Sequence, residues 1–378
     1  MTIKFEASKE NLLYSLSLLQ NIAGKKGTLA ILSNILIKSQ GNNVELIATD
    51  LEIGIKNELD ANIISQGSIT LPAKILYELV KESCSDFISI EEQDNYWVKI
   101  VSGTSVYNLA GISSEEYPDF PEYNEDMLVD VKANLFKELI DKTLFSIAHD
   151  RENNFTLTGA LLEKEQIDNN NYIRMVSSDG HRLSIKQTMI EDDLSTLNID
   201  KNTIIPRKGI LEIRKLCETS ENDNIKIGFD NKQLVVKSNN SLMIIRLMNG
   251  DFPDYKNLLK IINRKNSIEV ERKTFLESLR RTNLFTESIF NAVHLNIQKN
   301  IMILSSQNTD YGSATDKITI EYEGETLALG FNCKYFIEAI QVMSSEFINI
   351  YINSEQSPCL IEGKDDIGFV NIIMPMKI

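Results

Sequence analysis

Apolar residues recur at three- and four-residue steps in six short segments, and this spacing predicts a helix with one buried face in each. The segments are residues 9–22, 72–83, 132–148, 206–217, 271–285 and 333–343. In the first of them, the apolar stripe consists of Leu12, Leu13, Leu16 and Leu19. Pro72 and Pro206 suit the first turn of a helix, where the missing N–H group has no helical partner.

Three of these segments share a second pattern. Each contains a hydrophobic residue, a Lys three places later and an acidic residue four places after the Lys, at residues 71–80, 205–213 and 331–340. The lysines are 134 and 126 residues apart, close to a third of the 378-residue chain. Strand-like runs follow the other three segments, at 31–38 with 43–55, 157–163 with 172–186, and 290–297 with 301–306.

A matched order of helix, strands and second helix, occurring three times, predicts a duplicated architecture. The expected fold is α+β, with three repeated domains that each pack two helices on antiparallel sheets. Boundaries are expected at 1–122, 123–253 and 254–378, because the stretches 122–126 and 260–266 are polar enough for connectors.

Composition favours folded domains over disorder, since 42% of the residues are hydrophobic and 25% are charged. The N-terminus lacks a basic stretch followed by an apolar one, and no run approaches 18 apolar residues. We therefore expect no secretory signal, no membrane contact and a cytoplasmic location. The four cysteines lie far apart without a CxxC pair, which predicts reduced thiols and no structural zinc site.

A net charge of −15 is unfavourable for a protein that binds phosphates, but the charges are unevenly distributed. The six helical segments hold 15 Lys and Arg against nine Asp and Glu, a net +6, which leaves −21 for the remainder. Cationic helices on an acidic body suit a surface that attracts nucleic acid. On charge alone, an ordinary solvated helix face is an equally good interpretation.

Six further motifs occur in a fixed order along the chain. They are TLAILSN at 28–34, ATDLE at 48–52, SDGHRL at 178–183, IPRKG at 205–209, FPDY at 252–255 and MPMKI at 374–378. Together they resemble the corresponding motifs of bacterial DNA polymerase III beta subunits, the DNA sliding clamps, and the resemblance covers the whole chain.

This resemblance implies a non-catalytic processivity factor. Two chains would form a head-to-tail homodimeric ring around double-stranded DNA, with the helices lining the hole and no dependence on DNA sequence. The implied partners are the DNA polymerase III alpha subunit, an ATP-driven clamp loader, and other polymerases and repair proteins that carry clamp-binding motifs. No cofactor or metal is implied for the clamp itself.

The resemblance also implies a hydrophobic groove for partner peptides between the second and third domains. Its apolar walls would adapt to a ligand, while a few polar groups orient it. The groove residues would be Leu157, Ser178, Gly180, His181, Arg182, Leu183, Pro253, Leu258, Phe290, Asn332, Tyr335, Ile372, Met374, Pro375 and Met376. The chain departs from the family pattern at Asn257, Gln356 and Pro358.

Two more sets of residues follow from the resemblance. Residues facing DNA would be Lys25, Lys26, Lys74, Arg151, Arg207, Lys208, Arg214, Lys215, Arg280 and Arg281. In the loop 150–156, Phe155 and Thr156 stand where several relatives carry adjacent tyrosines, which puts an aromatic contact with single-stranded DNA in doubt. The dimer interface would join Tyr107 and Leu109 of one chain to Leu284 and Phe285 of the other.

Other interpretations compete with these. Asp179 and His181 could serve a hydrolase, although same-face neighbours on one strand do not by themselves make an acid–base pair. From the DGHR motif alone, a structural turn with Gly180 at positive φ is the simpler explanation. A peptide-binding scaffold that never meets DNA would share the groove but not the helix charge.

Overall fold

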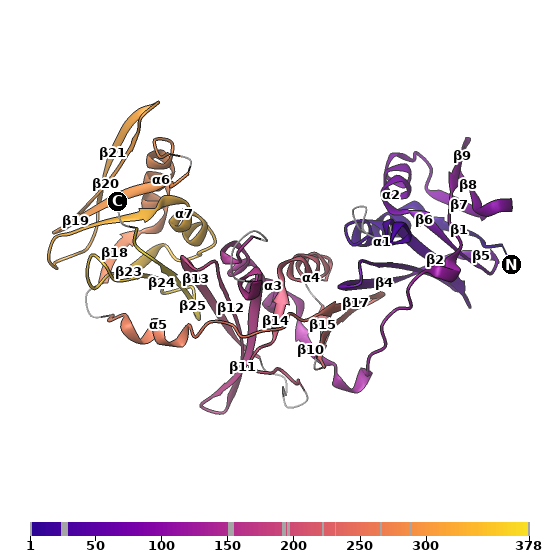
Figure 1. Ribbon diagram of the computed structural model, residues 1–378, viewed down its shortest axis with the longest axis horizontal. Helices are drawn as coiled ribbons and strands as arrows, with labels where there is room; N and C mark the ends of the chain where they lie inside the picture. The colour runs from indigo at the N-terminus through magenta and orange to yellow at the C-terminus, as the bar shows by residue number, and fades with distance from the viewer. Residues whose placement is uncertain are drawn as a thin grey trace. The chain divides into compact units, whose positions relative to one another are not determined.

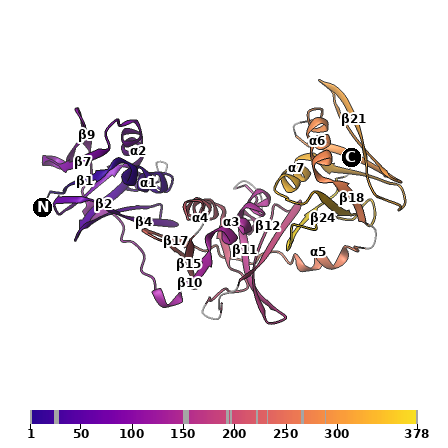
Figure 2. The ribbon, with the colours of Figure 1, turned by 180° about the vertical axis from the view of Figure 1, so that it is seen from behind.

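The computed structural model describes residues 2–23, 29–149, 155–190, 194, 197–220, 223–230, 232–264, 267–287 and 289–376 (Figures 1 and 2). The chain forms two compact units. The first contains Met1–Asn134, Leu194–Asn198 and Leu211–Leu247, and the second contains the remainder. Residues of the middle repeat therefore contribute to both units. Among the described helices, none has the length and apolar character needed to cross a membrane.

The larger sheet of the first unit is antiparallel and joins strands of the first two repeats. In order across the sheet, its strands are β10 (Val129–Lys132), β15 (Asn224–Phe229), β16 (Gln233–Ser238), β17 (Ser241–Arg246), β4 (Ile53–Asp60), β3 (Asn43–Thr49), β2 (Asn34–Gln40) and β6 (Ser68–Pro72). The two repeats meet where β17 pairs with β4, Met243 opposite Ile55. Main-chain hydrogen bonds thus make one continuous sheet from two repeats.

The smaller sheet of this unit has five strands, β5 (Asn62–Ser65), β1 (Lys4–Ser8), β7 (Phe87–Glu92), β8 (Trp97–Ser102) and β9 (Ser105–Ala110).

Helix α1 (Lys9–Leu19) follows Ser8, whose hydroxyl accepts a hydrogen bond from the Asn11 N–H group and caps the helix. It packs against β3, β4 and the neighbouring helix α2 (Ala73–Glu82) (Figure 1).

The second unit repeats this plan. Its larger sheet contains β14 (Ile204–Pro206), β11 (Gly159–Ile167), β12 (Asn170–Ser178), β13 (Arg182–Ile190), β25 (Phe369–Ile373), β24 (Cys359–Gly363), β23 (Phe347–Tyr351) and β18 (Ser267–Glu271). The second and third repeats meet where β13 pairs with β25, Leu183 opposite Ile372. The smaller sheet contains β21 (Gly312–Thr319), β20 (Ile301–Asn308), β19 (Ala292–Gln298) and β22 (Leu327–Asn332).

Helices α6 (Arg272–Asn283) and α7 (Cys333–Gln341) pack on each other in this unit, and α6 also covers β20 and β21. Between them lie the fully buried rings of Phe275, Phe331 and Phe336. Phe336 meets the other two edge to face, with centroids 5.8 and 5.2 Å away. Burying each such ring stabilises the fold by about 1.5–3 kcal/mol.

Helices α3 (Ala133–Asp141) and α4 (Arg207–Thr219) belong to the middle repeat, and the short α5 (Lys256–Ile261) follows it. The six amphipathic helices predicted from the sequence are confirmed. The segment 132–148 was predicted too long, because α3 ends at Asp141 and a separate 3₁₀ turn follows at Leu144–Ser146. Helix α5 was missed, since the stretch that begins at residue 260 was interpreted as a connector.

The strand prediction was correct in position, and the structural turn expected at the DGHR motif is confirmed, but the turn inside the run 43–55 was missed. The runs 43–55 and 172–186 each contain two strands, separated where an Asp side chain folds the backbone. Asp50 Oδ1 accepts hydrogen bonds from the N–H groups two and three residues later, at 3.0 and 2.7 Å. Asp179, 129 residues later, makes the same pair of bonds, as does Asn308 after a further 129 residues. This turn therefore recurs once in each repeat. Together with the order of helices and strands and the spacing from Lys to acid, it indicates triplication.

All four cysteines are free thiols, as predicted, with Cys84 exposed and the other three buried. Burial raises the pKa of the Cys333 thiol to about 12. It also raises the pKa of Cys359 well above its ordinary value. These buried cysteines behave as small apolar side chains in the core.

Candidate functional site

The turn between β12 and β13 carries the DGHR motif. Asp179 Oδ1 accepts from the backbone N–H groups of His181 and Arg182, both at 3.0 Å. Gly180, between Asp179 and His181, adopts φ +89°, a left-handed conformation in which a residue with a side chain would be strained. A structural turn is therefore sufficient to explain why the motif contains Asp179 and Gly180.

Arg182 gives this turn a long reach, because its guanidinium group is almost fully buried and contacts several elements. Nε donates to Asp179 Oδ2 at 2.9 Å, another nitrogen donates to the carbonyl of Phe145 at 2.5 Å, and a third pairs with Glu338 on α7. The cation also lies 4.4 Å from the ring centroid of Tyr335. Arg182 thus holds the turn of one repeat against the second helix of the next.

The C-terminal tail is fixed to two different sheets of the same unit. The Met374 N–H group donates to the carbonyl of His181 at 2.9 Å, and the Met376 N–H group donates to the carbonyl of Gly330 on β22 at 2.8 Å. Met374, Pro375 and Met376 are half-buried. Through these two backbone hydrogen bonds the tail bridges the turn after β12 and the smaller sheet.

A hydrophobic cluster lies on the larger sheet beside this tail. Leu183 and Ile372 are buried in it, and Leu258 of α5 is half-buried against it. Tyr255 holds the segment before α5 in place, since its hydroxyl donates to Glu163 and accepts from Arg174 at 3.3 Å. Burial, followed by the hydrogen bond to Glu163, raises the pKa of the Tyr255 phenol.

The other predicted groove residues have varied surroundings. Leu157 is buried in a 3₁₀ turn, and its Cδ1 would lie 4.0 Å from a Cβ on Gly180. The Asn332 side chain caps α7 by accepting from the Lys334 N–H group at 3.0 Å. Ser178 Oγ bonds within its own turn, and Pro253 is exposed. Asn257, where the family often has a basic residue, donates to Asp254 at 2.6 Å.

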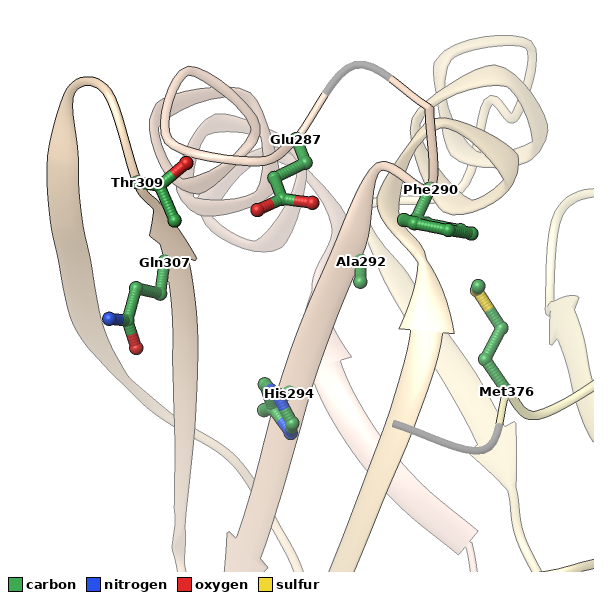
Figure 3. Close-up of a pocket in the computed structure, with 7 residues that line it drawn as sticks. All are labelled: Glu287, Phe290, Ala292, His294, Gln307, Thr309 and Met376. Carbon is green, nitrogen blue, oxygen red and sulfur yellow. The ribbon is translucent and has the colours of Figure 1, made fainter.

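Next to the tail is a cavity of about 440 Å³ that joins predicted and unpredicted residues (Figure 3). Phe290 and Met376 were predicted as groove residues. The remaining lining residues are Glu287, Ala292, His294, Gln307 and Thr309. Ala292 and His294 are alternate residues of β19 that face away from the core, a pattern that resembles an ordinary solvent-facing strand.

The arrangement of Asp179 and His181 does not form an acid–base pair. Both Asp179 oxygens accept hydrogen bonds, from two backbone N–H groups and from Arg182. In the described part of the chain, no hydrogen bond joins the Asp179 carboxylate to the His181 imidazole, and no cluster of His, Cys, Asp and Glu is placed to hold a metal.

The basic helices are partly neutralised by local acids. On α4, Lys215 pairs with Glu212 at 2.8 Å and Arg214 pairs with Glu218 at 2.6 Å. Arg207 donates to the carbonyl of Leu144 at 3.0 Å and to that of Ile147 at 3.4 Å.

Other predicted DNA-facing residues differ in their surroundings. Arg281 on α6 pairs with Asp316 at 2.5 Å. Lys74, Lys208, Arg280 and Arg281 are all exposed. Lys25, Lys26 and Arg151 lie outside the described residues.

Comparison with known proteins decides the family. Three models match in succession, the N-terminal, central and C-terminal domains of the DNA polymerase III beta subunit, at residues 3–121, 130–254 and 262–377. The chain belongs to the DNA polymerase III beta-subunit family, the sliding clamps. Sliding clamps are non-catalytic processivity factors. This agrees with Asp179, whose carboxylate oxygens accept hydrogen bonds from the turn and from Arg182.

Individual clamps align over their whole length. The beta sliding clamp of Haemophilus influenzae is 28% identical over 380 residues, covering 100% of both chains. The crystal structure of a sliding clamp from Bartonella birtlesii bound to griselimycin superposes with a TM-score of 0.93 at 25% identity, and that of the beta subunit from Thermotoga maritima with 0.89 at 25%. Both structural alignments cover 100% of each chain.

Two sheet edges of the clamp are relevant to the predicted dimer interface. Strand β9, which carries Tyr107 and Leu109, lies at the edge of the five-stranded sheet, and β21 lies at the edge of the four-stranded one. Tyr107 is 40% exposed and Leu284 is 72% exposed, whereas Leu109 and Phe285 are half-buried. Tyr107 also lines a shallow cavity of about 490 Å³ beside α2.

Proposed function

We propose that this clamp encircles duplex DNA as a head-to-tail homodimeric ring and tethers the DNA polymerase III alpha subunit and other partners through the groove between its second and third domains. The succession of three beta-subunit domain matches along one chain carries the proposal. The domains would be 1–122, 123–253 and 254–378, and the ring would act in the cytoplasm, opened by a separate clamp loader.

The helix charge supports a hole that accommodates DNA. A net +6 on six helical segments, against −15 for the chain, concentrates positive charge where phosphates would pass. The ion pairs on α4 and α6 weaken that attraction without removing it, which suits a protein that must slide. Contacts of this kind position DNA without reading its sequence.

The polar residues of the proposed groove form hydrogen bonds within the protein, and this supports the groove proposal. Arg182 and the Asp179 turn are bonded within the protein, so they shape the walls rather than compete for a ligand. Met374, Met376 and Phe290 then offer partly exposed apolar surface of the kind that binds short peptides. Rigid walls reduce the ordering cost of binding.

The proposed dimer pairs unlike edges. A head-to-tail contact joins the β9 edge of one chain to the β21 edge of the next, and closure after two chains leaves neither edge unpaired. Leu284 and Phe285 of one chain would pack on Tyr107 and Leu109 of the other. Covering the exposed Tyr107 and Leu284 and the half-buried Leu109 and Phe285 would add the apolar contribution that main-chain pairing lacks.

Retention on circular DNA tests the ring. We expect the clamp, loaded on a nicked circular plasmid by a clamp loader with ATP, to remain bound through gel filtration and to be lost when the plasmid is linearised. Retention of a peptide-binding scaffold would not depend on DNA topology. If loader and ATP never gave retention on the circle, the ring proposal would be wrong. If retention survived linearisation, simple electrostatic binding would replace it.

A further inference from the structure

The cavity beside the C-terminal tail has one apolar side and one polar side. Phe290 and Met376 form the apolar side, while Gln307 and Thr309 stand opposite them at the end of β20 (Figure 3). Ala292 and His294 of β19 lie between the two. Its volume of about 440 Å³ is in the range of pockets that hold a small ligand.

This cavity shares two lining residues, Phe290 and Met376, with the proposed groove. Phe290 is 53% exposed, so a ligand can contact its ring. Met376 is held in place by the hydrogen bond from its N–H group to the carbonyl of Gly330. A peptide that ends its groove contacts on these two side chains would enter the cavity with its next residues.

Glu287 gives the cavity a charge preference. Among the described lining residues it is the one carboxylate, and no hydrogen bond or ion pair within the described part of the chain engages its side chain. Its backbone position is fixed, since its carbonyl accepts from the N–H groups of Phe290 at 3.2 Å and Asn291 at 2.8 Å. A carboxylate in the lining of a part-apolar pocket favours a cation on a flexible apolar stem.

We propose that this cavity is an accessory subsite that takes a lysine or arginine side chain from the partner segment flanking the groove-binding motif, with Glu287 as its counter-charge. The proposal rests on the groove put forward above. It assigns a specificity role to Glu287, Gln307 and Thr309, and it explains how partners with the same core motif could be ranked by their flanking residues.

Binding of matched peptides to the full-length clamp tests the subsite. The probe is a fluorescein-labelled clamp-binding peptide of the polymerase III alpha subunit, and its competitors carry a Gly-Lys, Gly-Gln or Gly-Glu extension at either end. For the extension at one of the two peptide ends, we expect the Lys competitor to bind about threefold to fivefold more tightly than the Gln competitor, a difference of the size that an exposed ion pair gives. The Glu competitor should bind more weakly than the Gln competitor. Glu287→Gln should remove this order, and Glu287→Lys should reverse it.

Controls separate this inference from the groove itself. Glu277→Gln, an equal charge change at an exposed position of α6 that does not line the cavity, should keep the preference for Lys. Phe290→Ala should weaken all peptides, the unextended one included. If unextended peptide bound the clamp but no extension mattered, or if Glu287→Gln kept the order, the subsite would be wrong and the groove would stand. If the unextended peptide did not bind, both would fall.

Discussion

The ammonium group of Lys142 lies 2.7 Å from the carboxylate of Asp366, and both side chains are more than nine-tenths buried. Lys142 stands just after α3, in the second repeat, and Asp366 stands between β24 and β25, in the third. Lys142 also lies 4.8 Å from the ring centroid of Phe369, and Asp366 accepts from Ser344 and Ser345. One buried ion pair therefore joins the two repeats that carry the proposed groove.

Removing one partner should leave the other charged and buried. We expect Lys142→Met to lower the free energy of unfolding by about 2–4 kcal/mol, less than the largest such effects because Asp366 keeps its other hydrogen bonds. Urea unfolding followed by circular dichroism measures it. Lys299→Met, at an exposed pair with Glu323, is the matched control and should cost at most about 1 kcal/mol. Equal effects of the two substitutions would argue against the importance of burial.

The same pair predicts a dependence on pH. Burial by itself would raise the pKa of Asp366, but hydrogen bonds from Lys142, Ser345 and Ser344 outweigh it and hold the pKa below its ordinary 3.8. A lowered pKa stabilises the fold above pH 3.8, and this stabilisation is lost as the pH falls through the folded value. We expect unfolding free energy to fall more steeply below pH 4 in the wild type than in Asp366→Asn. Parallel curves would contradict the prediction.

Leu284→Ala combined with Phe285→Ala should give a monomer. Leu284 is exposed and Phe285 is half-buried in the single chain, and we expect the partner chain to cover their remaining surface, so folding should survive while association is lost. Sedimentation velocity measures the outcome. Phe347→Ala with Ile367→Ala removes exposed apolar side chains elsewhere on the same unit, and this control should stay dimeric. An unchanged dimer for the first variant would exclude the proposed interface.

Arg182→Lys should weaken peptide binding although the charge is kept. The ammonium group of Lys makes no planar stack on Tyr335 and lacks the fork that contacts Asp179, Glu338 and Phe145 together. We expect about tenfold weaker binding of a labelled clamp-binding peptide, equivalent to 1.4 kcal/mol. Arg264→Lys, at an exposed pair with Glu362, should leave affinity unchanged. Full binding by Arg182→Lys would show that the groove tolerates movement of this wall.

Adjacent arginines on α6 should differ in their contribution to DNA binding. Arg280 is exposed, whereas Arg281 is paired with Asp316 at 2.5 Å. We expect Arg280→Gln to reduce the slope of log affinity against log salt by about 0.9, the value for one lost phosphate contact, and Arg281→Gln to reduce it less. Anisotropy with a labelled duplex at several salt concentrations gives both slopes. A larger effect at Arg281 would mean that Asp316 releases it on binding.

Much of this fold is predictable because its signals are local. Each helix shows its own apolar period, and each of the Asp50 and Asp179 turns uses a side chain two or three residues from the backbone it folds. The DGHR motif predicted the turn at Asp179, but the turn at Asp50 was missed, since apolar residues continue on both sides of it. The short α5 was missed because its six residues carry too few turns to show a period.

The sequence by itself determined the three repeats, their six main helices, the uneven charge and the motifs that mark the family, because all of these depend on residues near one another in the chain. Only the tertiary structure decided which distant groups meet. Arg182 pairs with Glu338 across 156 residues and Lys142 with Asp366 across 224. The cavity at Glu287 likewise draws its walls from a loop, two strands and the tail. Such contacts depend on strand register and helix packing, which sequence spacing does not specify.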